Sequence, residues 1–285
     1  MYRLLFIAVV MLWLAAVAAL VHRDIWPAWT AQDPPPMTAT QFAGLERREQ
    51  FAIQDGQGRL IGRAWGEVGP ASSGLVSMSG TILIDGLSQL PYPIRVETES
   101  RFDGDGELDS FDLDVFGVPM IPINVHGERR GIYFPCELKV GTLHRQANLD
   151  LSASRMIGES IRPFNVLPKL RVGQSWRMQL LDPVAAVLKK RTEFNPVIAR
   201  VTHRETLSAG GGPVECFVVE IQDHGRAWVD DDGRVRRQVV NSPIPMLGRL
   251  TLEAEVYDEN ARKAARQLTR SRARAQPQGT HGGSD

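Results

Sequence analysis

The sequence predicts a mainly β protein, in which a bent antiparallel sheet or half-barrel with a short helical segment follows an N-terminal transmembrane helix. Three observations lead to this fold class. An uncharged apolar run stands at the N-terminus, side chains alternate between apolar and polar from Phe51 onward, and turn formers are frequent, with 26 Gly and 18 Pro. About ten strands joined by short turns favour a single domain.

The apolar run covers residues 4–21 and contains no charge. As a helix it would be about 27 Å long, close to the hydrocarbon thickness of a bilayer. Arg3 before the run favours a cytoplasmic N-terminus, and Trp26 and Trp29 beyond it suit a membrane–water interface. The alternative is a cleaved signal peptide, because residues 16–18 read Ala-Val-Ala, a small-x-small cleavage pattern. Either interpretation places the rest of the chain outside the cytoplasm.

Composition shifts divide the chain into four parts. Residues 1–21 form the membrane anchor or signal peptide, and residues 22–40 form a Pro-rich linker. The extracytoplasmic β domain covers residues 41–257. Residues 258–285 form a basic, partly disordered tail, interpreted as a solvated helix or as a contact for anionic lipid or envelope polymer. We therefore expect a single-pass protein of the inner (cytoplasmic) membrane, with its domain facing the periplasm or the extracellular space.

The alternation locates the strands of the domain. It predicts strands over residues 60–68, 76–84, 94–102, 111–115, 132–140, 176–180, 197–203, 214–221 and 250–256, and a hairpin over 228–240. The strand over 214–221 is apolar on both faces, which is typical of a central strand. Residues 150–170 break the pattern. They are predicted to contain a short helix that Pro163 and Pro168 end, and to serve as a lid or a crossing segment.

Two hairpins can be registered from the sequence. If Gly104-Asp105 is a two-residue turn, Val96 pairs with Leu113, and Glu97 lies opposite Asp112.

In the second hairpin, Gly233 takes the left-handed position of the turn. Val229 then pairs with Val235, and Trp228 lies near Arg236.

Charge and cysteine content exclude some functions. The chain has 33 Lys and Arg against 33 Asp and Glu, so no net field collects nucleic acid. Its two cysteines, Cys136 and Cys216, could form a disulfide in an oxidising compartment. Both fall on apolar strand faces, which favours two buried, free thiols.

The acidic run at residues 103–109 resembles a calcium loop. An EF-type loop needs Gly at its sixth position and Glu at its twelfth, where this chain has Leu108 and Asp114. Because the hairpin already explains the glycines of the run, no metal is expected there.

Other candidates for chemistry are also weak. Glu97, Glu99, Asp112 and Asp114 are predicted to share one face, where paired carboxylates can act as acid and base. A solvated ionic face explains them equally, because arginines are interleaved. His203 falls on an apolar phase, which favours a core histidine. No catalytic, cofactor-binding or metal-binding residue is predicted, and no cofactor.

The second half of the chain carries a family resemblance. It lies in the motifs Leu170–Trp176, Asp182-Pro183, Gly225–Asp230, Gly233–Arg237 and Leu247-Gly248. Their order is similar to the extracytoplasmic β-rich region that precedes transglutaminase-like domains in bacterial membrane-anchored proteins. The Cys-His-Asp catalytic domain of that family is absent here, so the resemblance implies an accessory domain. The pattern also resembles periplasmic lipoprotein carriers, whose curved sheet wraps an apolar cavity under a lid.

These observations predict a membrane-anchored, non-catalytic accessory or binding module of a bacterial cell-envelope system. Its expected partners are the membrane, through the N-terminal helix, and an envelope protein or lipid, but no nucleic acid. One alternative is a carrier of lipid or another apolar ligand inside the curved sheet. The other is an enzyme that uses the carboxylate face, in which alanine at Glu97 and Asp112 would abolish activity.

Overall fold

The computed structural model describes most of the β domain, both flanking helices and no bound group. The described residues are 2–21, 46–70, 76–87, 93–103, 108–117, 123–131, 133–149, 157–159, 170–181, 194–209, 212–221, 223–242 and 248–274. The predicted linker and the last residues of the tail lie outside them.

The described part of the domain forms one sheet of fifteen strands. The strands are β1 (Arg47–Gln54), β2 (Leu60–Pro70), β3 (Val76–Ile84), β4 (Ile94–Phe102), β5 (Leu108–Phe116), β6 (Ile123–Glu128), β7 (Phe134–Val140), β8 (Leu143–Leu149), β9 (Ile157–Glu159), β10 (Ser175–Leu181), β11 (Phe194–Ala209), β12 (Gly212–Ile221), β13 (Gly225–Asp230), β14 (Val235–Asn241) and β15 (Arg249–Glu255). The predicted mainly β fold is confirmed.

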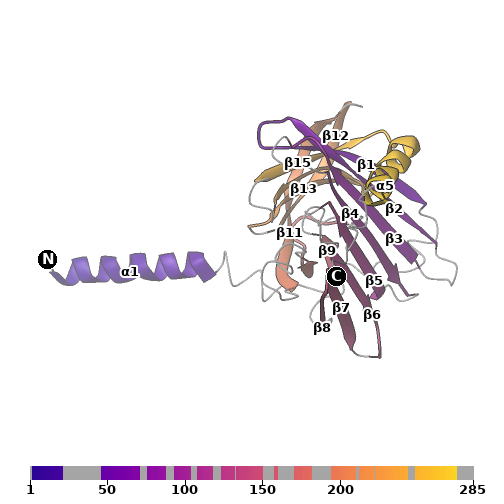
Figure 1. Cartoon of the computed structure of the whole chain (residues 1–285). Helices are drawn as coiled ribbons and strands as arrows, with labels where there is room; N and C mark the ends of the chain where they lie inside the picture. The colour runs from indigo at the N-terminus through magenta and orange to yellow at the C-terminus, as the bar shows by residue number, and fades with distance from the viewer. Residues whose placement is uncertain are drawn as a thin grey trace.

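The strand order is simple and the sheet is not closed into a barrel. It runs β8-β7-β6-β5-β4-β3-β2-β1-β15-β14-β13-β12-β11-β10-β9 (Figure 1). Neighbouring strands are antiparallel except β9 and β10, which are parallel. The first and last strands pair with each other in the middle of the order, where Phe51 lies opposite Ala254. The sheet therefore consists of two wings that meet at a central β1–β15 seam.

One face of this sheet, called the inner face here, carries the core. Its apolar side chains come from both wings and form one continuous cluster. The largest of them, Phe51, Phe134 and Trp176, are at most 1% exposed. Side chains on the opposite, outer face alternate with them, as the pleat of a strand requires.

The β4–β5 hairpin forms with a different register from the predicted one. Val96 pairs with Val115 rather than Leu113, and Glu97 lies opposite Asp114 rather than Asp112. The shift is two residues, and the register also slips between Arg101 and Phe102. A shift of two keeps every side chain on its predicted face, because the side-chain period of a strand is two.

The β13–β14 hairpin confirms one predicted pair and corrects the other. Val229 pairs with Val235, and Gly233 has a φ of 76°, the left-handed conformation that this turn needs. Trp228 lies opposite Arg237 rather than Arg236. The reason is a bulge between Trp228 and Val229, which moves the register by one residue.

The short helix predicted within residues 150–170 is wrong where the structure describes that segment. Residues 157–159 form strand β9, which adds to the sheet edge beside β10. The remainder of the segment up to residue 169 lies outside the described residues.

The basic segment after the sheet forms helix α5 (Glu259–Arg274), which packs against the outer face. Asp258 caps it, because its carboxylate accepts hydrogen bonds from the Asn260 and Ala261 N–H groups at 2.9 and 3.1 Å. Ala265 is 1% exposed, against Trp65 of β2 and Leu83 of β3. The interpretation of this segment as a solvated helix is therefore wrong for its first turns.

A polar network fastens α5 to strands β2 and β3. Arg262 is 3% exposed; it forms an ion pair with Glu67 and hydrogen bonds with the Tyr257 hydroxyl at 3.2 Å and the Ser79 hydroxyl at 3.3 Å. The Tyr257 hydroxyl in turn donates to Glu67 at 2.8 Å. The arginine is thus the polar centre of the contact between helix and sheet.

The apolar N-terminal run forms helix α1 (Tyr2–Leu20), which lies apart from the sheet in Figure 1. Large apolar side chains are exposed along it, including Phe6 at 70% and Leu12 at 73%. Across the described ranges, no helix combines the length and the apolar character that crossing a membrane requires.

Both cysteines are buried and free. Cys136 belongs to the inner-face core, whereas Cys216 belongs to an outer-face cluster with Val218 and Trp228. The prediction of two buried thiols on apolar faces is confirmed.

Candidate functional site

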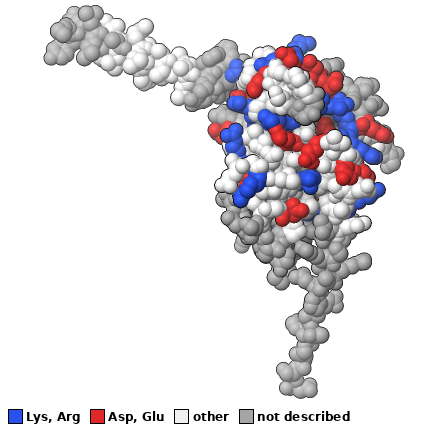
Figure 2. Space-filling view, turned by 90° about the horizontal axis from the view of Figure 1, so that it is seen from above, with Lys and Arg blue, Asp and Glu red and all other residues white. Residues whose placement is uncertain are grey.

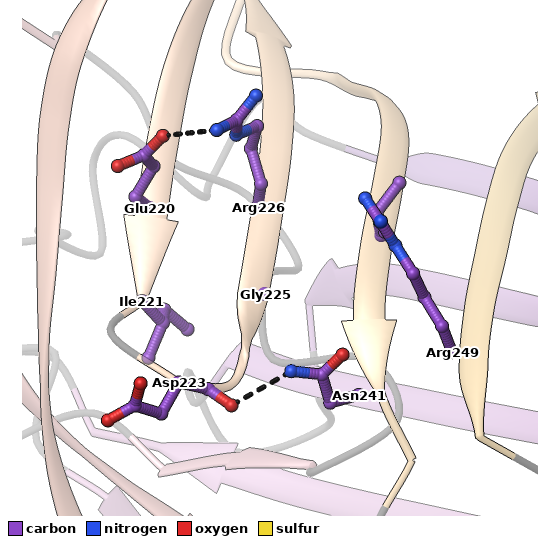
Figure 3. Close-up of a pocket in the computed structure, with 8 residues that line it drawn as sticks. Glu220, Ile221, Asp223, Gly225, Arg226, Asn241 and Arg249 are labelled. Atoms are coloured by element: carbon purple, nitrogen blue, oxygen red, sulfur yellow. Dashed lines mark hydrogen bonds and ion pairs between the residues drawn. The ribbon is translucent and has the colours of Figure 1, made fainter.

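A polar pocket opens on the outer face of the second wing, over strands β12 to β15 (Figure 3). Its volume is about 330 Å³. The lining residues are Glu220, Ile221, Asp223, Gly225, Arg226, Val239, Asn241 and Arg249. Hairpin pairing explains why they meet, since β12, β13, β14 and β15 follow one another both in the chain and in the sheet.

Two cross-strand rows build the pocket. In the first row, Glu220, Arg226 and Val239 are partners on β12, β13 and β14. The Arg226 guanidinium forms an ion pair with the Glu220 carboxylate, with nitrogen and oxygen 2.7 Å apart. In the second row, Asn241 of β14 lies opposite Arg249 of β15.

The turn between β12 and β13 supplies the remaining wall. The N–H of His224 donates to the carbonyl of Ile221 at 3.1 Å, which closes the turn. Asp223 has a φ of 61°, in the left-handed region that Asp tolerates better than most residues. The Asn241 side-chain amide donates to the Asp223 carbonyl at 3.0 Å and fixes the turn against β14.

Gly225 allows the strands to approach one another beneath the pocket. A Cβ atom at this position would lie 2.3 Å from the carbonyl oxygen of Val239, on the neighbouring strand. Backbone atoms cannot move aside as a flexible side chain can, so β13 needs glycine at position 225 for β14 to lie this close.

Two charges of the pocket are not neutralised within the protein. Over the described part of the chain, neither the Arg249 guanidinium nor the Asp223 carboxylate has a hydrogen-bond or ion-pair partner. Both side chains are exposed. Figure 3 shows Asp223 and Arg249 at opposite sides of the pocket, with Asn241 between them. The Asp223 carboxylate points away from Asn241 and Arg249, so the two unpaired charges do not face each other.

The tryptophan beside the pocket is not open to a ligand. The Arg226 and Arg237 guanidinium groups lie 5.8 and 5.9 Å from the centroid of the Trp228 ring. Its indole N–H donates to Glu205 at 3.3 Å, and its exposed fraction is 8%. This ring supports the arginines and leaves no free aromatic face for stacking.

The four predicted carboxylates do share one face of β4 and β5, where each has a partner. Glu99 pairs with Arg101 at 2.9 Å, Asp112 with His126 at 2.6 Å, and Asp114 accepts a hydrogen bond from Asn124. The fourth, Glu97, lies 3.6 Å from Arg266 of α5. These contacts support the interpretation as a solvated ionic face. Figure 2 shows acidic and basic side chains interspersed on the surface of the domain that it views.

The structure does not bring together the other candidate residues, which are His203 and the acidic run at residues 103–109. His203 is exposed rather than buried, because a bulge between Val201 and His203 turns it to the outer face, where it pairs with Glu205 at 3.6 Å. Of the acidic run, Asp103 pairs with Arg129 at 3.2 Å, and residues 104–107 lie outside the described residues. Among the described residues, no group of His, Cys, Asp and Glu has the arrangement to hold a metal ion.

Sequence reasoning missed this pocket, although one signal was present. Glu220 and Arg226 stand three residues before and after Asp223, the centre of the turn, so a hairpin pairs them. The free charges on Asp223 and Arg249 give no such signal, because exposed charged residues at strand ends are common.

Comparisons with known proteins identify no family for this chain. No family model matches the sequence, and no curated protein gives a significant match. Among solved structures, a β-barrel-like protein of the domain of unknown function DUF1849 from Brucella abortus has a TM-score of 0.45 at 10% identity, covering 74% of this chain and 97% of its own. A DUF1089 family protein from Pseudomonas aeruginosa has a TM-score of 0.37 at 16% identity, covering 61% of this chain and 87% of its own. Neither likeness says what this chain binds, and the resemblance to the region that precedes transglutaminase-like domains stays a prediction.

Proposed function

We propose that this protein is a non-catalytic accessory or binding module of a cell-envelope system, and that it binds through the outer-face pocket of β12–β15. One observation carries the proposal. The described apolar side chains of the inner face form one continuous buried cluster, whereas the outer face holds a pocket in which Asp223 and Arg249 have no partner among the described residues. Polar groups that converge in a pocket can fix the orientation of a small ligand.

Two features favour binding over catalysis. Burial raises the pKa of the Cys136 thiol to about 12, which disfavours the thiolate that a nucleophile requires. The carboxylates of Glu99, Asp112 and Asp114 on β4 and β5 are held by neighbouring arginine, histidine and asparagine side chains.

Helix α1 supports a location at the membrane. Phe6, Met11, Leu12 and Trp13 are each more than 60% exposed, a density of apolar surface that is unfavourable in water. We expect this helix to attach the chain to the cytoplasmic membrane or to direct its export, with the β domain on the outer side. A C-terminal fusion to a phosphatase that folds only outside the cytoplasm should be active, and deletion of residues 2–21 should abolish its activity. An inactive full-length fusion would contradict the location.

The carrier alternative draws on a different observation. Trp176 is fully buried in the inner-face core, and its indole N–H has no hydrogen-bond partner among the described residues. A buried, unsatisfied donor is unfavourable by about 1–3 kcal/mol. An apolar ligand with an oxygen acceptor would satisfy this donor if side chains of the inner face moved to admit it.

Native mass spectrometry distinguishes these functions. The full chain would be extracted from membranes in a non-ionic maltoside detergent, beside the variants Arg249→Glu and Trp176→Phe. A small polar adduct that Arg249→Glu removes and Trp176→Phe retains would support the outer-face module. A lipid adduct with the opposite dependence would support the carrier. A bare mass for all three proteins, or a hydrolase activity that survives contaminant controls, would count against the binding module.

A further inference from the structure

Helix α5 becomes strongly basic after its first turn. No Asp or Glu stands between Glu259 and Asp285, whereas five Lys and Arg residues fall within the helix beyond the buried Arg262. The five are Lys263, Arg266, Arg270, Arg272 and Arg274. Basic residues stabilise a helix dipole only within the last turn, and three of the five precede that turn. The helix dipole therefore does not explain the whole basic stretch.

The first two basic residues are accessible to water although each has a carboxylate neighbour. Lys263 lies 3.7 Å from Glu259 and is 66% exposed, and Arg266 lies 3.6 Å from Glu97 and is 44% exposed. The three arginines that follow Arg266 fall within the next eight residues, a helix length of about 12 Å. Without an acidic residue three or four positions away, the helix itself supplies no ion pair for these three arginines.

The helix that carries this charge is fixed to the sheet. Ala265 is 1% exposed against Trp65, and Arg262 is 3% exposed within its polar network. Arg95 of β4 donates a hydrogen bond to the carbonyl of Arg266 at 2.5 Å. The direction of α5 relative to the sheet is thus set as far as Arg266. A surface that bound the basic stretch would therefore orient the whole sheet.

The chain from the apolar N-terminal helix enters the domain beside α5. Arg48, near the start of β1, lies 3.8 Å from Glu259, and its guanidinium is 5.9 Å from the ring centroid of Tyr257. Residues 21–46 separate α1 from β1 and can span at most about 90 Å. A bilayer that holds α1 therefore keeps α5 close to its own surface, where a second contact is intramolecular.

From these observations we propose that the basic stretch of α5, residues 263–274, binds the anionic phospholipid headgroups of the membrane that holds α1. Each Lys or Arg near such a surface strengthens binding about fivefold. Leu268 is the only large apolar residue of the stretch, so the contact is electrostatic and lies at the headgroups rather than in the hydrocarbon. The proposal rests on the membrane location in the proposed function and adds the lipid class and the element that reads it.

Amide hydrogen exchange in nanodiscs tests this contact. The full chain would be reconstituted through α1 into discs of phosphatidylcholine alone, or of equal parts phosphatidylcholine and phosphatidylglycerol. Exchange over residues 266–274 reports the contact. The test variant combines Arg270→Gln, Arg272→Gln and Arg274→Gln, and glutamine keeps a helix propensity close to that of arginine.

A control variant separates the position of the charge from its amount. It removes three positive charges from exposed arginines of other segments, by Arg130→Gln, Arg171→Gln and Arg200→Gln. For the wild type and this control, we expect exchange to be about tenfold slower in discs with phosphatidylglycerol than in discs without it. The test variant should show no such difference, and high salt should abolish the difference in the wild type because it screens the charges.

Equal exchange in both kinds of disc would overturn the proposal, and so would full slowing in the test variant. Slowing by soluble dextran sulfate, with none by phosphatidylglycerol, would overturn it in favour of a soluble polyanion. A chain that enters neither kind of disc would overturn the membrane location as well. Incorporation without any lipid dependence overturns only the α5 contact, so the two proposals fail separately.

Discussion

Replacing Arg262 with methionine should loosen α5 from the sheet. Methionine keeps an unbranched apolar stem but removes the charge that meets Glu67 and the donors that reach Tyr257 and Ser79. The Glu67 carboxylate, 28% exposed, then loses its principal cation. Lys263→Met is the matched control, because Lys263 stands next in the helix and is 66% exposed.

The expected loss of stability follows from how far the Arg262–Glu67 ion pair is buried. Removing one partner of a fully buried pair costs about 3–5 kcal/mol. Glu67 keeps some contact with water, the Tyr257 hydroxyl at 2.8 Å and Arg48 at 3.6 Å. We therefore expect a loss of about 2 kcal/mol in the free energy of unfolding, and a fall in Tm of about 4–8 °C. Lys263→Met should stay within about 0.5 kcal/mol of the wild type.

Urea unfolding gives the free energy, and amide hydrogen exchange over residues 259–267 locates the effect. Adding Glu67→Gln to Arg262→Met should recover part of the loss, because no uncompensated carboxylate remains. Equal stabilities for Arg262→Met and Lys263→Met would refute the reasoning, and so would unchanged exchange in α5.

Three further changes test other parts of the structure. Burial raises the pKa of Glu67, but hydrogen bonds from Arg262 and Tyr257 outweigh this effect and hold the pKa below the ordinary 4.5. The stability that the Glu67 carboxylate contributes is therefore complete above about pH 4.5 and is lost as the pH falls through the folded-state pKa. Glu67→Gln should flatten this pH dependence in acid unfolding curves. Gly225→Ala should destabilise the protein by about 2 kcal/mol or more in urea unfolding, because the new Cβ meets a backbone oxygen of β14. It should also abolish the polar adduct in native mass spectra. Wild-type stability of this variant would contradict the close approach of β13 and β14. Burial raises the pKa of both thiols, Cys136 and Cys216, so neither should react with iodoacetamide at pH 8 in the folded protein, whereas both should react in urea. A product with no alkylated thiol in urea would indicate a disulfide between them.

Much of the sheet could be predicted because strand existence and strand faces depend on local alternation. The β4–β5 pair illustrates this, since its register is two residues from the predicted one and Val96 still faces the core. Register depends on loop length and on bulges, which the alternation does not encode. At Val201, a single bulge was enough to turn His203 from the predicted core to the surface.

The docking of α5 and the pocket could not be predicted for related reasons. Helix α5 packs through the small residues Ala261 and Ala265 and through a buried arginine, so its sequence has no broad apolar stripe to mark a packed face. The pocket consists of charged residues that also suit a solvated strand face. Its character comes from which charges stay unpaired, and that depends on side-chain positions rather than on residue type.

The central β1–β15 seam governs how this sheet can be assembled. Most strands pair with a neighbour in sequence, so each wing can grow locally, whereas the seam brings Gln50 against Glu255, 205 residues away. During synthesis the two wings therefore remain separate until the end of the chain is available, and the last strand joins them in one slow, non-local step. Until then β1 and β14 each present an open edge, which a second chain can pair with. A protein truncated before Arg249 would lose β15 and should be a strong candidate for aggregation, even though fourteen of its fifteen strands are intact.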